Sequence, residues 1–243
     1  MEEIKISVIT VCYNAADTLE KTIQSVLGQT YRNIEYIIID GGSTDGTVEI
    51  IHRYANRLAY WVSEPDEGIY DAMNKGILVS RGKYIYFLGA DDTLCENVLL
   101  EIAPLLTHTH TIYYGDVYMI NQKRSYDGLF SCYKLAIHNI CHQAIFYSHS
   151  IYEERLYDVN YRLFADYVFN IQSWGDKRIK FVYLPFIVAN FNDCGRSSNK
   201  KNDSLFLKKN SMLVLQNLGF ICFMYYQFVH LYLKLKSFFS RNV

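Results

Sequence analysis

The sequence predicts an α/β protein with a mostly parallel central sheet, flanked by helices and followed by a helical tail. Two observations predict it. Short apolar, β-branched runs alternate with stretches whose apolar residues recur at helical spacing, which is typical of βαβ units. Near the C-terminal end, a long stretch without charged residues lies between lysines, which is typical of an amphipathic or hydrophobic helix. At 243 residues the chain has room for one sizeable core with an appendage.

The first βαβ unit occupies the first forty residues. Residues 4–11 and 36–39 are apolar runs without a helical period, which predicts two buried strands. Residues 15–27, between them, have apolar side chains at helical spacing. A unit of this kind predicts a parallel strand pair joined by a right-handed crossover.

The same alternation continues through the first half. We expect helices over residues 47–54 and 71–79, and strands over 58–62 and 84–88. Ser43, Thr44 and Asp45 are the candidates for the N-cap of the first of these helices.

The second half is less regular, and no internal repeat is visible. Its expected elements are strands over residues 111–119, 144–147 and 181–188 and a helix over about 165–174.

Charge separates the C-terminal end from the rest. The net charge is −1, but residues 200–243 hold seven Lys or Arg and one acidic residue. This asymmetry indicates an anionic partner such as a phospholipid surface, and not nucleic acid, because the remaining residues are acidic in sum. Residues 212–233 carry no charge but are interrupted by polar side chains, which favours a helix lying in the membrane interface. The alternative is that these aromatic residues pack on the body.

The six cysteines are dispersed without a C-x-x-C pair, and the first residues lack the pattern of a signal peptide. Both observations indicate a reducing, cytoplasmic compartment.

Polar residues follow the first two predicted strands. Thr10, Cys12 and Asn14 lie at the end of the first, and Asp40 ends the second. A carboxylate at this edge can accept the ring N–H of a uracil, while backbone groups near Thr10 bind the other edge of the base. Alternatively, Asp40 only caps the following turn.

Two acidic segments follow. Residues 64–76 are rich in acids and place Asp71 and Lys75 four residues apart, which alone predicts a surface ion pair on a helix. Asp91 and Asp92 follow the strand expected over residues 84–88. Carboxylates there suit Mg²⁺ or Mn²⁺ that also binds a diphosphate, although a solvated acidic pair is the alternative.

These segments resemble the inverting family 2 glycosyltransferases, especially bacterial members that build capsule, exopolysaccharide and lipopolysaccharide. The resemblance runs through residues 6–14, 29–31, 39–47 and 64–76 and the acidic pair Asp91-Asp92. It implies a GT-A fold, with a Rossmann-like sheet, and a catalytic domain over residues 1–200. Residues 1–95 would form its nucleotide-binding half and 96–200 its acceptor half, followed by a basic, aromatic-rich tail over 201–243.

The resemblance also implies site residues. The nucleotide-sugar pocket would be lined by Thr10, Cys12, Asn14, Asp40, Asp71, Lys75 and Asp91. Asp92 would be the principal ligand of Mg²⁺ or Mn²⁺, with Asp91 near the ribose or the metal. The strict Asp-x-Asp pattern is absent, because Ala90 precedes two adjacent acids, so the ion's ligand is open between these two.

Three further residues come from weaker resemblance in the second half. Asp166 is the expected general base, His142 would position the acceptor or the diphosphate, and Arg196 would cover the donor phosphates. The alternatives are an aspartate stabilised by the helix dipole and a buried structural histidine.

We therefore expect an inverting transferase that moves a sugar from a UDP-sugar to a saccharide or lipid-linked acceptor, at the inner face of the cytoplasmic membrane. A binding module without catalysis is the first rival. A Rossmann oxidoreductase is the second, but the first strand is not followed by G-x-G-x-x-G.

Overall fold

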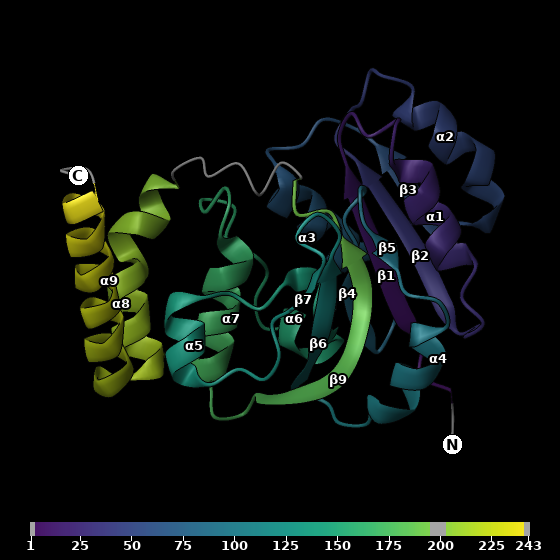
Figure 1. Ribbon diagram of the computed structural model, residues 1–243. Coiled ribbons are helices and arrows are strands. Elements are labelled where there is room, and N and C mark those ends of the chain that lie inside the picture. The colour runs from purple at the N-terminus through teal and green to yellow at the C-terminus, as the bar shows by residue number, and fades with distance from the viewer. Residues whose placement is uncertain (1–2, 195–202, 241–243) are drawn as a thin grey trace.

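A computed structural model of the chain, which describes residues 3–194 and 203–240, shows one mixed α/β body carrying two long C-terminal helices (Figure 1). Its first half contains four parallel strands in the order β3 (Tyr60–Ser63), β2 (Ile34–Asp40), β1 (Ile6–Cys12) and β4 (Tyr84–Phe87). Strands β1, β2 and β4 are almost entirely buried and rich in Ile, Val and Tyr, as parallel strands covered on both faces require, whereas β3 at the edge is partly exposed.

The same sheet continues through the second half with mixed directions. Strand β8 (Ile145–Ser148) is antiparallel to β4, and β6 (Thr111–Met119) is antiparallel to β8. Strand β9 (Lys180–Phe191) is parallel to β6, and the short β5 (Thr93–Leu94) and β7 (Arg124–Tyr126) pair antiparallel to β9 and β6. The predicted α/β class and central sheet are confirmed, with the parallel pairs concentrated in the first half.

Helices cover both faces of the sheet. One face carries α1 (Leu19–Leu27), α2 (Thr47–Tyr54) and α4 (Val98–Ile102). These helices share a buried cluster with the side chains that β1 and β2 direct to this face. The other carries α3 (Ile69–Val79), α5 (Cys132–Ile137), α6 (His149–Tyr152) and α7 (Ala165–Gly175). Short 3-10 turns lie at Ala55–Arg57, Ala103–Leu105 and His142–Ala144.

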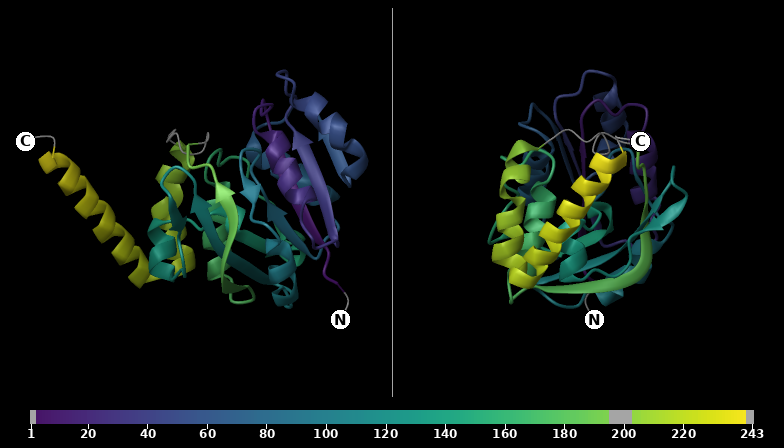
Figure 2. Two further views of the ribbon diagram at one scale, coloured as in Figure 1. Left: turned by 45° about the vertical axis from the view of Figure 1, so that its right-hand side comes forward. Right: turned by 60° about the vertical axis from the view of Figure 1, so that its left-hand side comes forward.

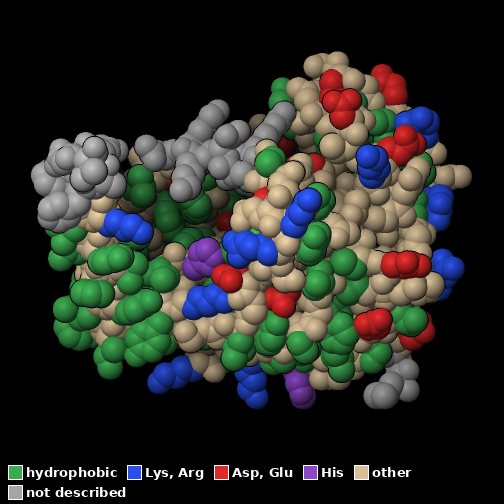
Figure 3. All heavy atoms as spheres, in the orientation of Figure 1, with side chains coloured by type: hydrophobic (Ala, Val, Ile, Leu, Met, Phe, Trp, Pro, Cys, Tyr) green, Lys and Arg blue, Asp and Glu red, His purple; other side chains and the backbone are tan. Residues whose placement is uncertain are grey.

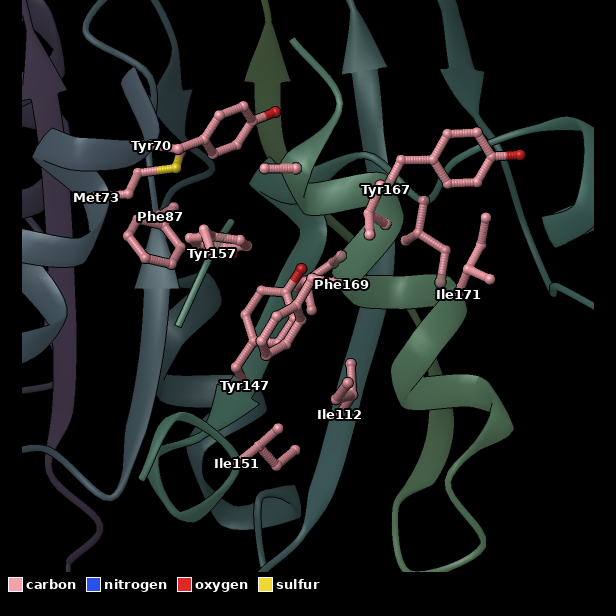
Figure 4. Close-up of a cluster of buried hydrophobic side chains, with 14 of the residues drawn as sticks. Tyr70, Met73, Phe87, Ile112, Tyr147, Ile151, Tyr157, Tyr167, Phe169 and Ile171 are labelled. Atoms are coloured by element: carbon pink, nitrogen blue, oxygen red, sulfur yellow. The ribbon is translucent and has the colours of Figure 1, made fainter. Parts of the chain in front are cut away.

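Aromatic side chains fill the space between α3 and α7. Figure 4 shows Tyr70 of α3 and Phe169 of α7 directed toward the same cluster, with Tyr147 of β8 and Tyr157 between the elements. Most ring pairs in this cluster meet at tilted or edge-on angles, for example with centroids 5.2 Å apart between Tyr157 and Phe169, while Tyr152 stacks on Phe169. The cluster holds α7, and with it the start of that helix, against α3 and β4 of the first half.

Element boundaries follow the sequence where the apolar pattern is local. The helix expected over residues 47–54 and the strand expected over 111–119 have those bounds in the structure. Helix α1 begins at Leu19 and not at residue 15, because residues 15–18 form turns tied to the neighbouring loop. Strand β9 runs three residues past its expected end, since these residues pair with β5 and β6.

The tail is two helices and not one. Helix α8 (Ser204–Leu218) ends at Gly219, whose φ of 87° suits glycine, and α9 (Phe220–Ser240) then turns back along it. Helix α8 packs on α7, and Phe206, Leu213 and Val214 join the buried cluster there. The first turns of α9 bury Cys222 and Tyr226, whereas its later turns extend away from the body (Figure 2). Among the described residues no helix is long and apolar enough to cross a membrane.

Candidate active site

The predicted site residues of the first half lie at one edge of the sheet. The parallel strands β1, β2 and β4 end there, and β8, which is antiparallel to β4, begins there. Ligands bind outside this edge in open α/β sheets. The 3-10 turn His142–Ala144 lies just beyond the end of β4, because Phe146 pairs with Tyr86. This pairing brings polar residues of both halves to one edge.

Asp40 is fully buried at the end of β2 and organises the following turn. Its Oδ2 accepts hydrogen bonds from the amides of Gly42 and Ser43, at 3.1 and 2.9 Å, and from the Ser63 hydroxyl at 2.6 Å. Its Oδ1 accepts from the Ser43 hydroxyl at 2.5 Å and the Cys12 thiol at 3.5 Å. These contacts match the turn-capping alternative, and a base could be accepted only in place of one of these donors.

The loops after β1 and β2 are joined to each other. Asn14, with φ of 49°, accepts the Thr44 amide on its side-chain oxygen at 3.0 Å and donates its own amide to the Ser43 hydroxyl at 2.7 Å. Thr10 is buried, and its hydroxyl lies 3.1 Å from that of Tyr36. Burial strongly raises the pKa of the Cys12 thiol. Thr10 and Cys12 are therefore buried beneath the loop, and Asn14 joins it to the loop after β2.

Asp71 and Lys75 lie on the first turns of α3, next to the loop after β3. Lys75 Nζ is 3.5 Å from Asp71 and 2.9 Å from Glu64, and it donates to the carbonyl of Pro65. This three-way contact raises the pKa of the lysine, the hydrogen bond to Glu64 being the main cause. Lys75 thus fixes the loop to the helix in addition to forming the expected i, i+4 pair.

The same loop packs against the turn that follows Asp40. A Cβ on Gly41 would lie 2.4 Å from Asp66 Oδ2, so a side chain at this position would require the Asp66 carboxylate to move. Burial raises the pKa of Asp66, although the Gly68 amide, 2.9 Å from its Oδ1, opposes the shift. Asp66 is a polar residue of the site edge that the sequence pattern did not single out.

Asp92 is 1% exposed, and both of its carboxylate oxygens have partners. Gln143 donates to Oδ2 at 2.6 Å, and the Asn192 amide donates to Oδ1 at 2.7 Å. Burial raises the pKa of this carboxyl to about 7. An ion at Asp92, the predicted principal metal ligand, would have to share each oxygen with one of these donors and would bind in a desolvated place, where a charged carboxylate is costly.

Asp91 is the more accessible of the two acids. It is half-buried, and its Oδ2 accepts one hydrogen bond, 3.1 Å from the side-chain amide of Asn192. In the described part of the chain, no three His, Cys, Asp or Glu side chains gather in a way that could hold a metal. An ion at Asp91 would therefore take its other ligands from substrate phosphates and water, which is the usual manner of Mg²⁺. A hard oxygen donor at the edge of the sheet fits such an ion.

Asp166 lies in the first turn of α7 and is 6% exposed. Tyr70 donates its hydroxyl to Oδ1 at 2.6 Å, and Asn139 donates its side-chain amide to Oδ2 at 2.8 Å. The start of a helix also favours a negative charge. The carboxylate is thus oriented by groups from two other parts of the chain.

His142, on the turn before β8, lies next to Asp166. Its Nδ1 is 3.9 Å from Asp166 Oδ2. Burial lowers the pKa of the imidazole, whereas the negative charges of Asp166 and Asp91 act in the opposite direction. The charges of Asp91, which follows β4, and of Asp166, in the first turn of α7, therefore both act on the pKa of His142.

Several contacts of this site were not anticipated from the sequence. Tyr70 lies inside residues 64–76, which the family resemblance covers, and Gln143 follows the predicted site residue His142, but no role was predicted for either. Asn139 and Asn192 carry no local signal, because their partners are distant in the chain. Arg196, expected over the donor phosphates, lies outside the described residues.

Comparison with known proteins connects this geometry to a family. The model of the family described as "Glycosyl transferase family 2" matches residues 7–169. A PGL/p-HBAD biosynthesis glycosyltransferase of Mycobacterium tuberculosis is 35% identical over 211 residues, covering 84% of this chain and 82% of the relative. A cholesterol galactosyltransferase of Borreliella burgdorferi is 35% identical over a shorter stretch, covering 42% of this chain and 30% of the relative.

Solved structures agree with the fold. TarS residues 1–349 of S. aureus in complex with UDP-GlcNAc has a TM-score of 0.69 at 14% identity, over 88% of this chain and 67% of the other. The mannosyltransferase PcManGT from Pyrobaculum calidifontis, in complex with GDP-Man and Mn²⁺, has a TM-score of 0.64 at 16% identity, over 89% and 64%. The GT-A fold expected from the sequence is confirmed.

Proposed function

The chain belongs to glycosyl transferase family 2, as its sequence indicated, and from that premise we propose that it moves a sugar from a nucleoside-diphosphate sugar to a hydroxyl group with inversion of the anomeric carbon. One observation supports this most directly. Asp91 follows β4, and the turn that carries His142 lies just beyond the end of the same strand, with His142 Nδ1 3.9 Å from Asp166 at the start of α7. A donor sugar held between these two acids would have one beside its diphosphate and the other beside the acceptor.

The donor side consists of the loops after β1, β2 and β3. We assign the nucleotide to the surface that Asn14, Asp71 and Lys75 shape, with Asp40, Thr10 and Cys12 holding its shape from beneath. A UDP-sugar is the preferred donor. This preference rests on resemblance and on the UDP-GlcNAc bound by a structural neighbour, whereas another neighbour binds GDP-Man.

A divalent cation is part of this proposal, and Mn²⁺ is present in one structural neighbour. Among the residues of this chain we assign its coordination to Asp91, the accessible acid, and give Asp92 the role of holding the loop. When bound, Mg²⁺ or Mn²⁺ would offset the charge on the leaving diphosphate. We place Arg196, by resemblance, at the same phosphates.

Asp166 is proposed as the general base. The acceptor oxygen attacks the anomeric carbon, its proton passes to the Asp166 carboxylate, and the bond between that carbon and the diphosphate breaks with the electron pair leaving on the diphosphate. General-base catalysis contributes roughly 10²- to 10⁴-fold. Tyr70 and Asn139 each donate a hydrogen bond to this carboxylate, at 2.6 and 2.8 Å, and so orient it for this step.

The acceptor is proposed to be a saccharide or a lipid-linked molecule. Two relatives bear names that refer to PGL/p-HBAD biosynthesis and to cholesterol. In this chain, apolar side chains gather on the surface of the tail helices (Figure 3). The exposed members on α9 include Phe220, Ile221, Met224, Phe228, Leu231 and Leu235.

We propose that α9 lies on the inner face of the cytoplasmic membrane. Lys234 and Lys236 follow its apolar surface, and Lys208 and Lys209 lie on the neighbouring α8. Apolar side chains beside lysines suit an interface with anionic lipid. Such contact would bring the site to a lipid-linked acceptor.

A turnover assay tests the proposal. Purified protein is incubated with a panel of UDP-, GDP- and dTDP-sugars and with short saccharide and lipid-linked acceptors, and release of the nucleoside diphosphate is measured. We expect one donor to be consumed, and Asp166→Asn to lower its turnover by 10²-fold or more without weakening nucleotide binding. Binding without turnover for any combination would instead favour a nucleotide-sugar-binding module.

A further inference from the structure

We propose that Tyr70 and Asn139 are positioning residues for Asp166, and that Tyr70 connects the donor-binding helix to the carboxylate that accepts the proton. The inference rests on the proposed function. It assigns a task to two side chains that neither the sequence pattern nor the family resemblance had marked. Both make their contacts with Asp166 in the described structure.

Tyr70 is a hydrogen-bond donor to Asp166, and its side chain is buried. It is 7% exposed in the first turn of α3, next to Asp71. Its hydroxyl is 2.6 Å from Asp166 Oδ1 and 3.0 Å from the carbonyl of Leu163, and the single proton goes to the charged and nearer acceptor. Burial and the adjacent Asp166 charge hold the pKa of this phenol well above its usual value, so it remains a donor.

Asn139 ends a directed chain of hydrogen bonds. Tyr147 donates to Oδ1 of Asn170 at 3.0 Å, Asn170 donates to Oδ1 of Asn139 at 3.0 Å, and Asn139 donates to Asp166 Oδ2 at 2.8 Å. Each amide uses its oxygen to accept from the preceding member. The Asn139 amide therefore has only one orientation that satisfies both partners, with its N–H directed at the carboxylate.

Such a chain polarises toward its charged end. Tyr147 and Asn170 are fully buried, where hydrogen bonds are electrostatically stronger than in water. With one fixed donor on each oxygen, the Asp166 carboxylate cannot rotate, yet each oxygen retains capacity for a second partner. The carboxylate of the proposed base is therefore oriented before the acceptor binds.

Other titratable groups that face Asp166 come from every neighbouring element. His142 lies on the turn before β8, and the phenols and thiol with an electrostatic contact are Tyr126, Cys141, Tyr147, Tyr152, Tyr157 and Tyr167. Burial raises the pKa values of these phenols and of the thiol, so they stay neutral between pH 5 and 9. Of these neighbours only His142 can change its charge there.

The experiment compares kcat as a function of pH for Tyr70→Phe and Tyr152→Phe. Tyr152 is the matched control, because it lies in the same aromatic cluster and its hydroxyl bonds to Tyr157, 2.6 Å away, and not to Asp166. For Tyr70→Phe we expect the acidic limb to move up by about one pH unit, with kcat below that limb reduced roughly tenfold and nucleotide affinity unchanged. Asn139→Ala should move the limb in the same direction.

The outcomes separate the inference from its premise. Suppose that the wild type turns over a donor and Asp166→Asn does not. If Tyr70→Phe then changes kcat by the same factor at every pH, and by no more than Tyr152→Phe changes it, the positioning role is wrong and the proposed transferase activity stands. An acidic limb that disappears in His142→Gln would belong to His142 and would also overturn the assignment. A wild type that consumes no donor would overturn both claims.

Discussion

Gln143 donates a hydrogen bond of 2.6 Å to the carboxylate of Asp92, joining the turn before β8 to the loop after β4. The second oxygen of that carboxylate accepts the Asn192 amide, from the residue that follows β9. Three segments far apart in the sequence therefore meet on one buried acid. The contact explains why Asp92 and Asp91, though adjacent, have different surroundings: Asp92 is buried among donors, whereas Asp91 is the more accessible.

The raised pKa of Asp92, about 7, predicts how stability depends on pH. An unfolded aspartate titrates near 3.9, so between about pH 4 and 7 the folded protein binds more protons at this site than the unfolded chain does. Stability contributed by the protonated form is thus present at low pH and is lost as pH rises through 7. Relative to Asp92→Asn, the free energy of unfolding of the wild type should fall by roughly 2–4 kcal/mol between pH 5 and 8. Denaturant titrations of both proteins measure this, and a difference independent of pH would refute it.

Gly76 provides a packing prediction. A Cβ at this position would lie 2.6 Å from the buried Ile9 Cγ2, where α3 crosses β1. Alanine normally stabilises a helix by up to about 1 kcal/mol relative to glycine, but overpacking costs about 1–3 kcal/mol. We expect Gly76→Ala to destabilise the protein by about 1–2 kcal/mol net, measured by denaturant titration. Leu78→Ala, on the exposed side of the same helix, is the control and should change stability by less than about 0.5 kcal/mol.

The exposed apolar surface of α9 predicts membrane binding. Replacing Phe228 and Leu231 with serine should weaken binding to anionic vesicles at low salt at least tenfold, since each side chain contributes roughly 1.5–3 kcal/mol when buried in an apolar phase. The melting temperature should not change. Co-sedimentation measures the binding, with Leu78→Ser and Leu100→Ser as the control pair on other exposed surfaces. Equal loss in both pairs, or no binding by the wild type, would contradict the assignment of α9.

Much of the fold could be predicted from the sequence where the signals are local. Helix α2 and strand β6 have apolar patterns that need no distant partner, and their bounds agree. The break between α8 and α9 also has a local signal, because glycine commonly ends a helix and Gly219 does so here. The absence of charge across residues 212–233 hides this break, since it makes the stretch resemble a single apolar segment. The short β5 was missed because two residues form a strand only when β9 lies beside them.

The site was predictable to the level of segments but not of contacts. That Asp40 and Asp91 meet at one edge follows from parallel strands alone. Whether Asp91 or Asp92 is accessible depends on Gln143 and Asn192, which lie 51 and 100 residues beyond Asp92. No local pattern encodes such a separation, and the same holds for the donation from Tyr70 to Asp166 across 96 residues.

Binding of nucleotides tests the central claim most directly. Calorimetric titration of UDP, GDP and dTDP into the wild type, Asp91→Asn and Asp92→Asn, each with Mn²⁺ and with excess chelator, measures affinity and metal dependence together. The account predicts that one nucleotide binds the wild type more tightly with Mn²⁺, that Asp91→Asn abolishes this dependence, and that Asp92→Asn retains it. Equal affinities with Mn²⁺ and with chelator in all three proteins, or no binding of any nucleotide, would contradict it.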